Sequence, residues 1–161
     1  MPTAQEVLDR LKAGNQRFVN GNTSLAKTLS HHERAEMAKD QNPFAIVLGC
    51  SDSRVPAEMV FDQGLGDLFV IRVAGNVVAP SQVGSVEFAA ERYDCPVVVV
   101  LGHSHCGAIQ ATHAVRSNVF ASVNQLRHGS AVLENLIAKG ELIVVGAEYS
   151  LETGEVTFFD F

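Results

Sequence analysis

Two helices are predicted at the start of the chain, over residues 3–20 and 30–39. Each range begins with a capping box, in which a Ser or Thr is followed three residues later by Glu. In the first helix the apolar side chains recur at helical spacing and form one stripe, made by Val7, Leu11 and Phe18. Because both helices precede any strand, we expect this N-terminal helical arm, residues 1–40, to bury its apolar stripe against another surface. A partner subunit is a candidate.

After residue 40 the pattern changes to short apolar strands separated by helices. Four runs rich in Val, Ile and Leu are nearly continuous rather than alternating: residues 44–49, 68–73, 97–102 and 142–147. Such strands are typical of a parallel sheet that helices cover on both faces. Apolar residues at helical spacing predict two of these helices, over residues 80–93 and 130–139.

A final strand is predicted over residues 155–161. Only residues 151–154 separate it from the strand before it, which is too short for a crossover helix and typical of a hairpin. The sequence therefore predicts an α/β fold, as one domain over residues 1–161. We expect a mainly parallel four-stranded sheet with an antiparallel C-terminal edge strand, helices on both faces and the N-terminal helical arm.

The composition narrows the class of protein. A chain of 161 residues with 47% hydrophobic and 19% charged residues is long enough to bury a core. The net charge of −6 and the scatter of the 12 Lys and Arg residues argue against nucleic acid or an anionic membrane as a partner. No run approaches the roughly 20 apolar residues of a membrane span, and the start of the chain lacks a signal-peptide pattern, so we expect a cytoplasmic protein.

The three cysteines favour a reducing compartment and a metal site over a disulfide framework, because their number is odd and their spacing wide. Cys95 precedes Pro96 and a Val run, and the simplest interpretation is a small buried apolar residue. The other two, Cys50 and Cys106, each follow a predicted strand closely.

A zinc site is predicted where the first and third strands end. Cys50 directly follows the first of these strands, and His103 directly follows the third, with Cys106 three residues later. Because ligands in open α/β sheets bind beyond the carboxyl ends of the strands, we expect these side chains to meet. Three such ligands with an open fourth position are typical of catalytic zinc, whereas structural zinc usually has four. The alternative is a pair of buried thiols and a capping histidine.

Asp52 and Arg54 add a charged pair two residues beyond the first ligand. A carboxylate there can take the fourth position on the metal or accept a hydrogen bond from bound water, and the planar guanidinium of Arg54 can hold it in a bidentate pair. The alternative is a local turn in which Asp52 and Ser53 cap a helix that starts near Val55.

Three motifs in this order resemble those of the β-class carbonic anhydrases: residues 50–56, 72–76 and 102–108, read as CSDSRVP, RVAGN and GHSHCGA. The closing segment 146–154 extends the resemblance over nearly the whole chain. The resemblance implies reversible hydration of carbon dioxide to bicarbonate by one zinc ion per chain, bound by Cys50, His103 and Cys106. It also implies that Asp52 and Arg54 orient water, and that an obligate homodimer or higher homo-oligomer places its active sites at the subunit interface.

The resemblance also implies a narrow substrate pocket. By position, Gln41 matches the substrate-binding amide of the family, and Phe69, Ala74 and Phe88 match the apolar lining, with Phe88 where a tyrosine is common. The plainer alternatives are a loop residue for Gln41 and core aromatics for the two phenylalanines. The chain has no Trp, and the subset of the family that binds bicarbonate at an inhibitory site uses one there. We therefore expect the constitutively open form.

One departure from the family concerns the segment near His113. Larger members carry a further, mostly helical stretch between the helix at Cys106 and Arg116, which this chain lacks. A natural or an engineered deletion would explain the difference. It bears on the helical packing over the sheet and on the oligomer more than on the metal ligands.

Other activities and proton routes stay open at this level. The same zinc hydroxide would hydrolyse carbonyl sulfide or carbon disulfide, and a structural or regulatory zinc module whose chemistry has lapsed is a further alternative. His105, His31 and His32 titrate in the range needed to carry the released proton, although surface histidines are common.

Overall fold

A computed structural model describes residues 2–24, 30–109 and 112–159, with the backbone alone at residues 112 and 113. None of the helices in these ranges combines the length and apolar character needed to cross a bilayer. The helical elements are α1 (Ala4–Val19), α2 (His31–Met37), α3 (Ala57–Val60), the 3-10 turn η1 (Ala74–Asn76), α4 (Pro80–Tyr93), α5 (Thr112–His128) and α6 (Ala131–Ala138). The strands are β1 (Ala45–Gly49), β2 (Leu68–Arg72), β3 (Val97–His103), β4 (Ile143–Tyr149) and β5 (Val156–Phe158).

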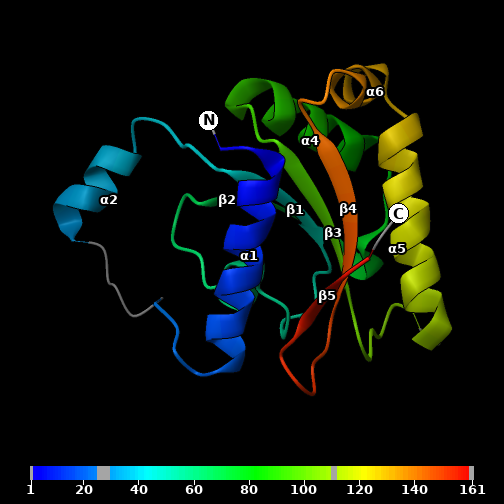
Figure 1. Cartoon of the computed structure of the whole chain (residues 1–161), viewed down its shortest axis with the longest axis horizontal. Coiled ribbons are helices and arrows are strands. Elements are labelled where there is room, and N and C mark those ends of the chain that lie inside the picture. The colour runs from blue at the N-terminus through cyan, green and yellow to red at the C-terminus, as the bar shows by residue number, and fades with distance from the viewer. Residues whose placement is uncertain (1, 25–29, 110–111, 160–161) are drawn as a thin grey trace.

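The strands form one sheet in the order β2-β1-β3-β4-β5 (Figure 1). The first four are parallel, and β5 pairs antiparallel with the end of β4. This confirms the predicted fold class, including the antiparallel edge. The predicted bounds of the first four strands differ from the observed ones by up to two residues, whereas β5 is shorter than predicted, and residues 160–161 lie outside the described part of the chain.

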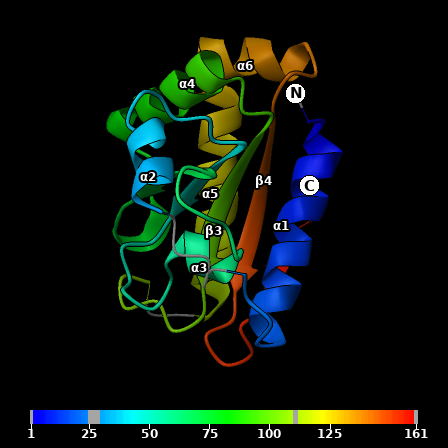
Figure 2. The same cartoon turned by 90° about the vertical axis from the view of Figure 1, so that its left-hand side faces the viewer.

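Helices cover both faces of the sheet, as predicted. In the turned view α1 lies on one side of the sheet and α4, α5 and α6 lie on the other (Figure 2). Side chains of β1 and β3 alternate between the two resulting cores: Val47 and Val99 pack toward α1, whereas Ile46 and Val98 pack toward the α4–α6 layer. All residues of β1 and β3 are buried, which explains their continuous apolar sequence.

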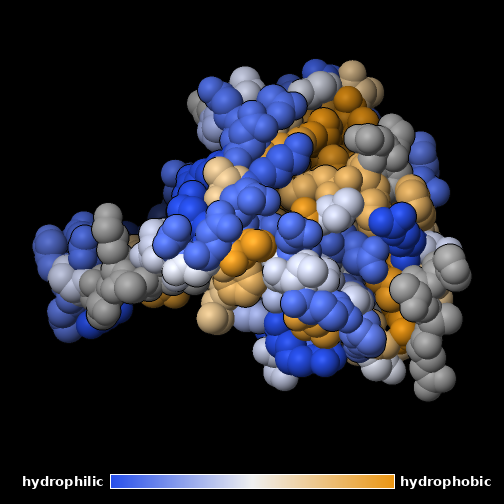
Figure 3. Space-filling view, turned by 60° about the horizontal axis from the view of Figure 1, so that its bottom comes forward, coloured by the Kyte–Doolittle hydropathy of each residue, from blue (hydrophilic) through white to orange (hydrophobic). Residues whose placement is uncertain are grey.

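The two helices of the N-terminal arm behave differently. Val7 and Leu11 of α1 are buried against this chain's own sheet, so the first helix finds its apolar surface within the chain and not on a partner subunit. Helix α2 has no buried residue, and it projects from the body of the molecule (Figures 1 and 3). Both predicted capping boxes are present.

Within the described part of the chain, α5 is a long helix that the sequence pattern did not predict. Its buried stripe is made by Val115, Val119, Val123 and Leu126, at spacings of four, four and three, so a helical signal was present. Valine is a weak helix former because its branched side chain loses rotamer freedom. Packing against β3 and β4 overrides this weak preference.

Candidate metal centre

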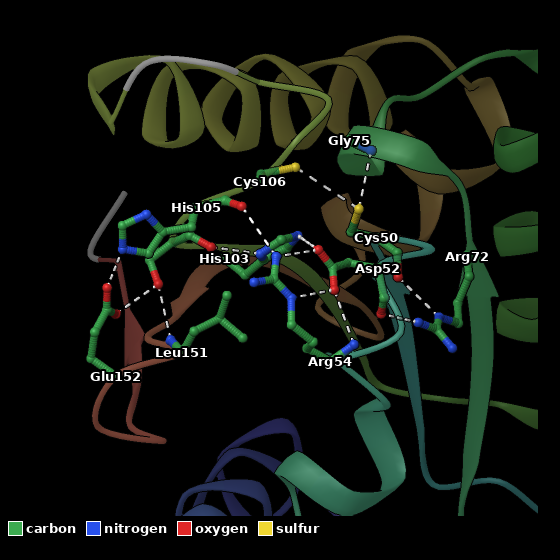
Figure 4. Close-up of polar contacts among 11 residues, drawn as sticks. Cys50, Asp52, Arg54, Arg72, Gly75, His103, His105, Cys106, Leu151 and Glu152 are labelled. Atoms are coloured by element: carbon green, nitrogen blue, oxygen red, sulfur yellow. Dashed lines mark hydrogen bonds and ion pairs between the residues drawn. The ribbon is translucent and has the colours of Figure 1, made fainter.

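The topology brings the predicted ligands together at one edge of the sheet. β1 and β3 are parallel neighbours, with Gly49 opposite Leu101, so Cys50 and His103 emerge side by side, and Cys106 returns to them after a short loop (Figure 4). One ligand atom of each of these three residues lies within 4.8 Å of the others, and all three residues are buried. The two sulfur atoms are 4.0 Å apart.

The hydrogen bonding of the His103 imidazole leaves one ring nitrogen free to bind a metal. Its Nδ1 lies 2.8 Å from the carbonyl oxygen of Ser104, which only accepts, so Nδ1 carries the proton and Nε2 keeps a free lone pair. Nε2 is fully buried and has no hydrogen-bond partner among the residues that the structure describes. A buried polar atom is rarely left unpaired in a folded protein. An orphaned imidazole nitrogen beside two thiols is the donor set that zinc prefers, so the residues fit this metal.

The two thiols differ in their surroundings. The backbone N–H of Gly75 donates to Cys50 Sγ at 3.3 Å. Burial raises the pKa of the Cys106 thiol, and the neighbouring Cys50 raises it further. Two thiolates this close also repel each other, and a divalent cation bound between them would offset both this repulsion and the cost of burying their charge.

Asp52 is held by Arg54 in the predicted bidentate pair (Figure 4). Arg54 Nε donates to Asp52 Oδ1 at 2.9 Å, and Nη2 donates to Oδ2 at 2.7 Å. These hydrogen bonds hold the pKa of Asp52 well below its usual range, although burial opposes them. Asp52 Oδ2 also lies 3.8 Å from His103 Nε2. An ionised carboxylate therefore lies beside the free lone pair of the imidazole.

The alternative interpretation of Asp52, as a helix cap, is wrong. Helix α3 begins at Ala57, later than the expected start near Val55, and its N-cap is Pro56, which has no side-chain oxygen to cap the helix. The backbone N–H of Arg54 does donate to Asp52 Oδ1 at 3.0 Å, so Asp52 closes a local turn. That turn fixes the carboxylate and does not start a helix.

Two residues that support the site were not assigned a function from the sequence. Arg72, at the end of β2, donates from Nε to the carbonyl oxygen of Cys50 at 2.9 Å and from Nη2 to that of Asp52 at 2.6 Å. Gly75 provides the N–H that meets Cys50 Sγ. Both belong to the second motif, residues 72–76. The motif was the available signal, but sequence spacing does not reveal contacts to backbone atoms.

The predicted substrate-binding residues fall in two places. Ala74 belongs to η1, directly before Gly75 and the metal centre. Gln41, Phe69 and Phe88 instead gather around Tyr93: Gln41 Nε2 donates to the Tyr93 hydroxyl at 2.9 Å, and the two phenylalanine rings lie 6.1 Å apart. Phe88 is half exposed.

The remaining cysteine and the histidines considered above lie elsewhere. Cys95 is buried, its thiol donates to the carbonyl oxygen of Pro43 at 3.3 Å, and burial raises its pKa to about 12. These observations agree with the predicted buried apolar residue. His31 and His32 are exposed on α2, whereas His105 pairs through Nε2 with the carboxylate of Glu152.

Comparison with known proteins places these features in a family. Residues 45–116 match the family model of carbonic anhydrase. Carbonic anhydrase 2 of Mycobacterium tuberculosis is 35% identical over 187 aligned positions, which cover 93% of this chain and 90% of that protein. The carbonic anhydrase of Mycolicibacterium smegmatis is 50% identical over 102 positions, covering 63% of this chain and 49% of that protein.

The fold agrees with this relationship. A solved chain, described as one of two tetrameric β-carbonic anhydrases from Sordaria macrospora, matches 96% of this chain over 94% of its own length, with a TM-score of 0.73 at 21% identity. The 187 positions aligned with the M. tuberculosis protein outnumber the 161 residues of this chain, so that relative carries residues without a counterpart here. The chain has the three motifs and the fold, and it is 35% identical to the M. tuberculosis protein over 93% of its own length. It therefore belongs to the β-class carbonic anhydrases.

Proposed function

We propose that this chain binds one zinc ion through Cys50, His103 and Cys106 and catalyses the reversible hydration of carbon dioxide to bicarbonate and a proton. The observation that carries the proposal is the convergence of three buried residues, each with one donor atom within 4.8 Å of the others, together with the orphaned Nε2 of His103. Zinc held by such a set acts as a Lewis acid that makes water a nucleophile near neutral pH, a property for which carbonic anhydrases are the standard example.

Asp52 and Arg54 would direct that chemistry. Both oxygens of Asp52 accept hydrogen bonds from Arg54, so direct binding of Asp52 to the metal would compete with this pair. The pairing supports the constitutively open form, in which the fourth position is left to water. Asp52 Oδ2, 3.8 Å from His103 Nε2, is near enough to accept a hydrogen bond from water beside that atom. As an acceptor only, it would orient the water so that a lone pair faces the carbon of the substrate.

We propose that the substrate pocket is completed by a second copy of the chain. Ala74 adjoins the metal centre of its own chain, whereas Gln41, Phe69 and Phe88 form a separate cluster around Tyr93. Carbon dioxide is small, uncharged and without a donor, so aromatic walls and a single amide suit it. The Sordaria macrospora enzymes are tetrameric, and a homodimer or higher homo-oligomer would bring this cluster to a neighbouring metal centre.

The proposed compartment is the cytoplasm. Two of the three cysteines lie in the candidate metal site, and all three are free thiols. Zinc thiolates persist where the surroundings are reducing, which supports an intracellular location.

The test is to measure zinc content and carbon dioxide hydration on the purified full chain. We expect one zinc per chain and rapid hydration in a stopped-flow assay with a pH indicator. Cys106→Ser should lose most of its zinc and its activity, because the remaining two ligands hold the metal poorly. The same assay with carbonyl sulfide and carbon disulfide compares substrates. Zinc without turnover of any of the three would contradict the proposed activity and favour a lapsed module.

A further inference from the structure

The turn between β4 and β5 is tied to the loop that carries two of the candidate ligands (Figure 4). The backbone N–H of Ser104 donates to the carbonyl oxygen of Tyr149 at 2.9 Å. The N–H of Leu151 donates to Ser104 Oγ, also at 2.9 Å. Ser104 lies directly between His103 and the turn at His105, so these bonds attach the ligand loop to a second element.

Glu152 is the centre of this attachment. Its Oε2 accepts hydrogen bonds from Ser104 Oγ at 2.9 Å and from Ser150 Oγ at 3.1 Å. Its Oε1 pairs with His105 Nε2. The bond from Ser104 is the largest of the effects that lower the pKa of Glu152 to about 2, so the carboxylate is ionised. One side chain therefore holds two consecutive residues of the ligand loop.

The loop needs such a support because its backbone is strained. His105 has a φ of +51°, in the left-handed region that a residue with a Cβ occupies at a cost. Such a conformation persists where the surrounding contacts fix it, and it is common at functional sites. The carbonyl oxygen of His105 then accepts a hydrogen bond from Arg54 Nη2 at 3.3 Å, the same nitrogen that donates to Asp52.

We infer that Glu152 is a positioning residue for the candidate metal centre. It holds Ser104 and His105 in the left-handed turn that directs His103 and Cys106 toward Cys50 and that gives Arg54 its carbonyl acceptor. The inference rests on the proposed zinc site. It extends that site to a residue about fifty positions away in sequence, whose carboxylate touches none of the three ligand side chains in the contacts described above.

An isolated ion pair between the exposed side chains of Glu152 and His105 would not be enough to hold the ligand loop. The side chains of His105 and Glu152 are 70% and 54% exposed, and an isolated pair at such exposure adds little to stability. Glu152 differs because it also accepts from Ser104, whose carbonyl oxygen orients the His103 ring. Its loss should therefore lower metal affinity while leaving global stability nearly unchanged.

The experiment compares Glu152→Ala and Glu152→Gln with Glu155→Gln in the full chain. Glu155 is an exposed glutamate on the same hairpin, so its replacement matches the change of charge. Zinc affinity is measured by competition with a chromophoric chelator, and ligand geometry by the visible spectrum of the cobalt-substituted protein. We expect Glu152→Ala to bind zinc about 10–100-fold more weakly, as is typical for partners of metal ligands. Glu152→Gln keeps an acceptor for Ser104 and should lose less, and Glu155→Gln should match the wild type.

Each other outcome is decisive. Wild-type zinc affinity and an unchanged cobalt spectrum in Glu152→Ala would overturn the inference while leaving the proposed function intact. A clear fall in the urea midpoint of metal-free Glu152→Ala, compared with the metal-free wild type, would also overturn it. Glu152 would then stabilise the whole fold and not the ligand loop alone. A wild-type chain that binds no zinc would overturn the proposed function and this inference together.

Discussion

Two arginines determine the conformation of the segment that begins at Cys50. Arg54 fixes the carboxylate of Asp52 from the side chain, and Arg72 fixes the backbone carbonyl groups of Cys50 and Asp52. The planar guanidinium group suits both tasks, because its donors lie in one rigid fork. A lysine has a single charged nitrogen and would not make either paired contact.

Replacing Asp52 separates metal binding from catalysis. Asp52→Asn keeps the three candidate ligands, so we expect close to one zinc per chain. The variant amide carries only one acceptor oxygen, and its NH2 group cannot accept a hydrogen bond from water. We expect the hydration rate in a stopped-flow assay to fall roughly 10²–10⁴-fold, the range usual for a positioned proton acceptor. Full activity with full zinc would rule out the orienting function of Asp52.

The residues of the candidate site were predictable to different degrees. Cys50, His103 and Cys106 follow strand ends, so strand order and chemistry together predicted that they meet. Asp52 and Arg54 are two positions apart, and their pairing is local. Arg72 and Glu152 act through backbone atoms and through residues distant in sequence, and no periodicity or spacing signals such contacts.

At the scale of elements, a helix requires glycine where its backbone packs too closely against another segment to leave room for a Cβ atom. Gly14 lies on α1 where a Cβ atom would come within 1.8 Å of the carbonyl oxygen of Phe61. Gly84 lies on α4, where a Cβ atom would meet no atom of the described residues within 4 Å. The two helices therefore offer a matched pair of substitutions.

Gly14→Ala and Gly84→Ala should have opposite effects on stability. Alanine favours a helix over glycine by about 0.5–1 kcal/mol, so Gly84→Ala should raise the free energy of unfolding by that amount. In Gly14→Ala the clash with a backbone atom outweighs this gain, and we expect a loss of about 2–4 kcal/mol. Urea unfolding followed by circular dichroism measures both. Equal effects of the two substitutions would show that α1 does not approach the turn at Phe61 this closely.

The attachment of α1 to the turn after α3 depends on Asp62. This side chain is fully buried and accepts hydrogen bonds from Arg17 at 2.5 Å and from Ser24 at 2.8 and 3.0 Å. Burial alone would raise the pKa of Asp62, but these bonds outweigh it and lower the pKa below its usual value. A group whose pKa is lower in the folded protein stabilises the fold above its unfolded pKa and loses this effect as the pH falls.

Asp62→Asn should therefore destabilise the protein in a pH-dependent way. We expect a loss of roughly 1–3 kcal/mol in the free energy of unfolding above about pH 5, because a charged acceptor is lost. The difference from the wild type should shrink as the pH falls below about 4, the usual pKa of an unfolded aspartate. Asp9→Asn, at an exposed site on α1, serves as the control. A difference that does not change with pH would contradict the ionised state of Asp62.

The pattern of the chain predicted the elements unevenly for physical reasons. β1 and β3 are buried on both faces, and their continuous apolar runs left little doubt about strand and sheet type. Capping boxes fixed the starts of α1 and α2. Helix α5 was missed because valine, which makes up most of its buried stripe, has a weak preference for helices. The packing of that stripe on β3 and β4 stabilises the helix, and this packing cannot be inferred from local sequence.

At the scale of the whole molecule, two parts of the surface have features that are typical of contacts with another subunit. Helix α2 has no buried residue and projects from the body (Figure 3). Phe88 is 52% exposed on α4, in edge-to-face contact with Tyr93. Aromatic side chains are enriched at the cores of protein interfaces. Both features support the proposed homo-oligomer.

Phe88→Arg tests the oligomer and the shared pocket together. If this aromatic cluster faces a second copy, a charged side chain there leaves a buried cation without a partner, so the dissociation constant of the oligomer should rise at least about 100-fold. Sedimentation velocity should then show monomers where the wild type shows larger species. Zinc content should remain one per chain, because all three candidate ligands come from a single chain. Glu134→Arg, at an exposed site on α6, places the same side chain elsewhere and should leave the mass unchanged. A Phe88→Arg protein with the wild-type mass and the wild-type hydration rate would remove this face from both the interface and the pocket.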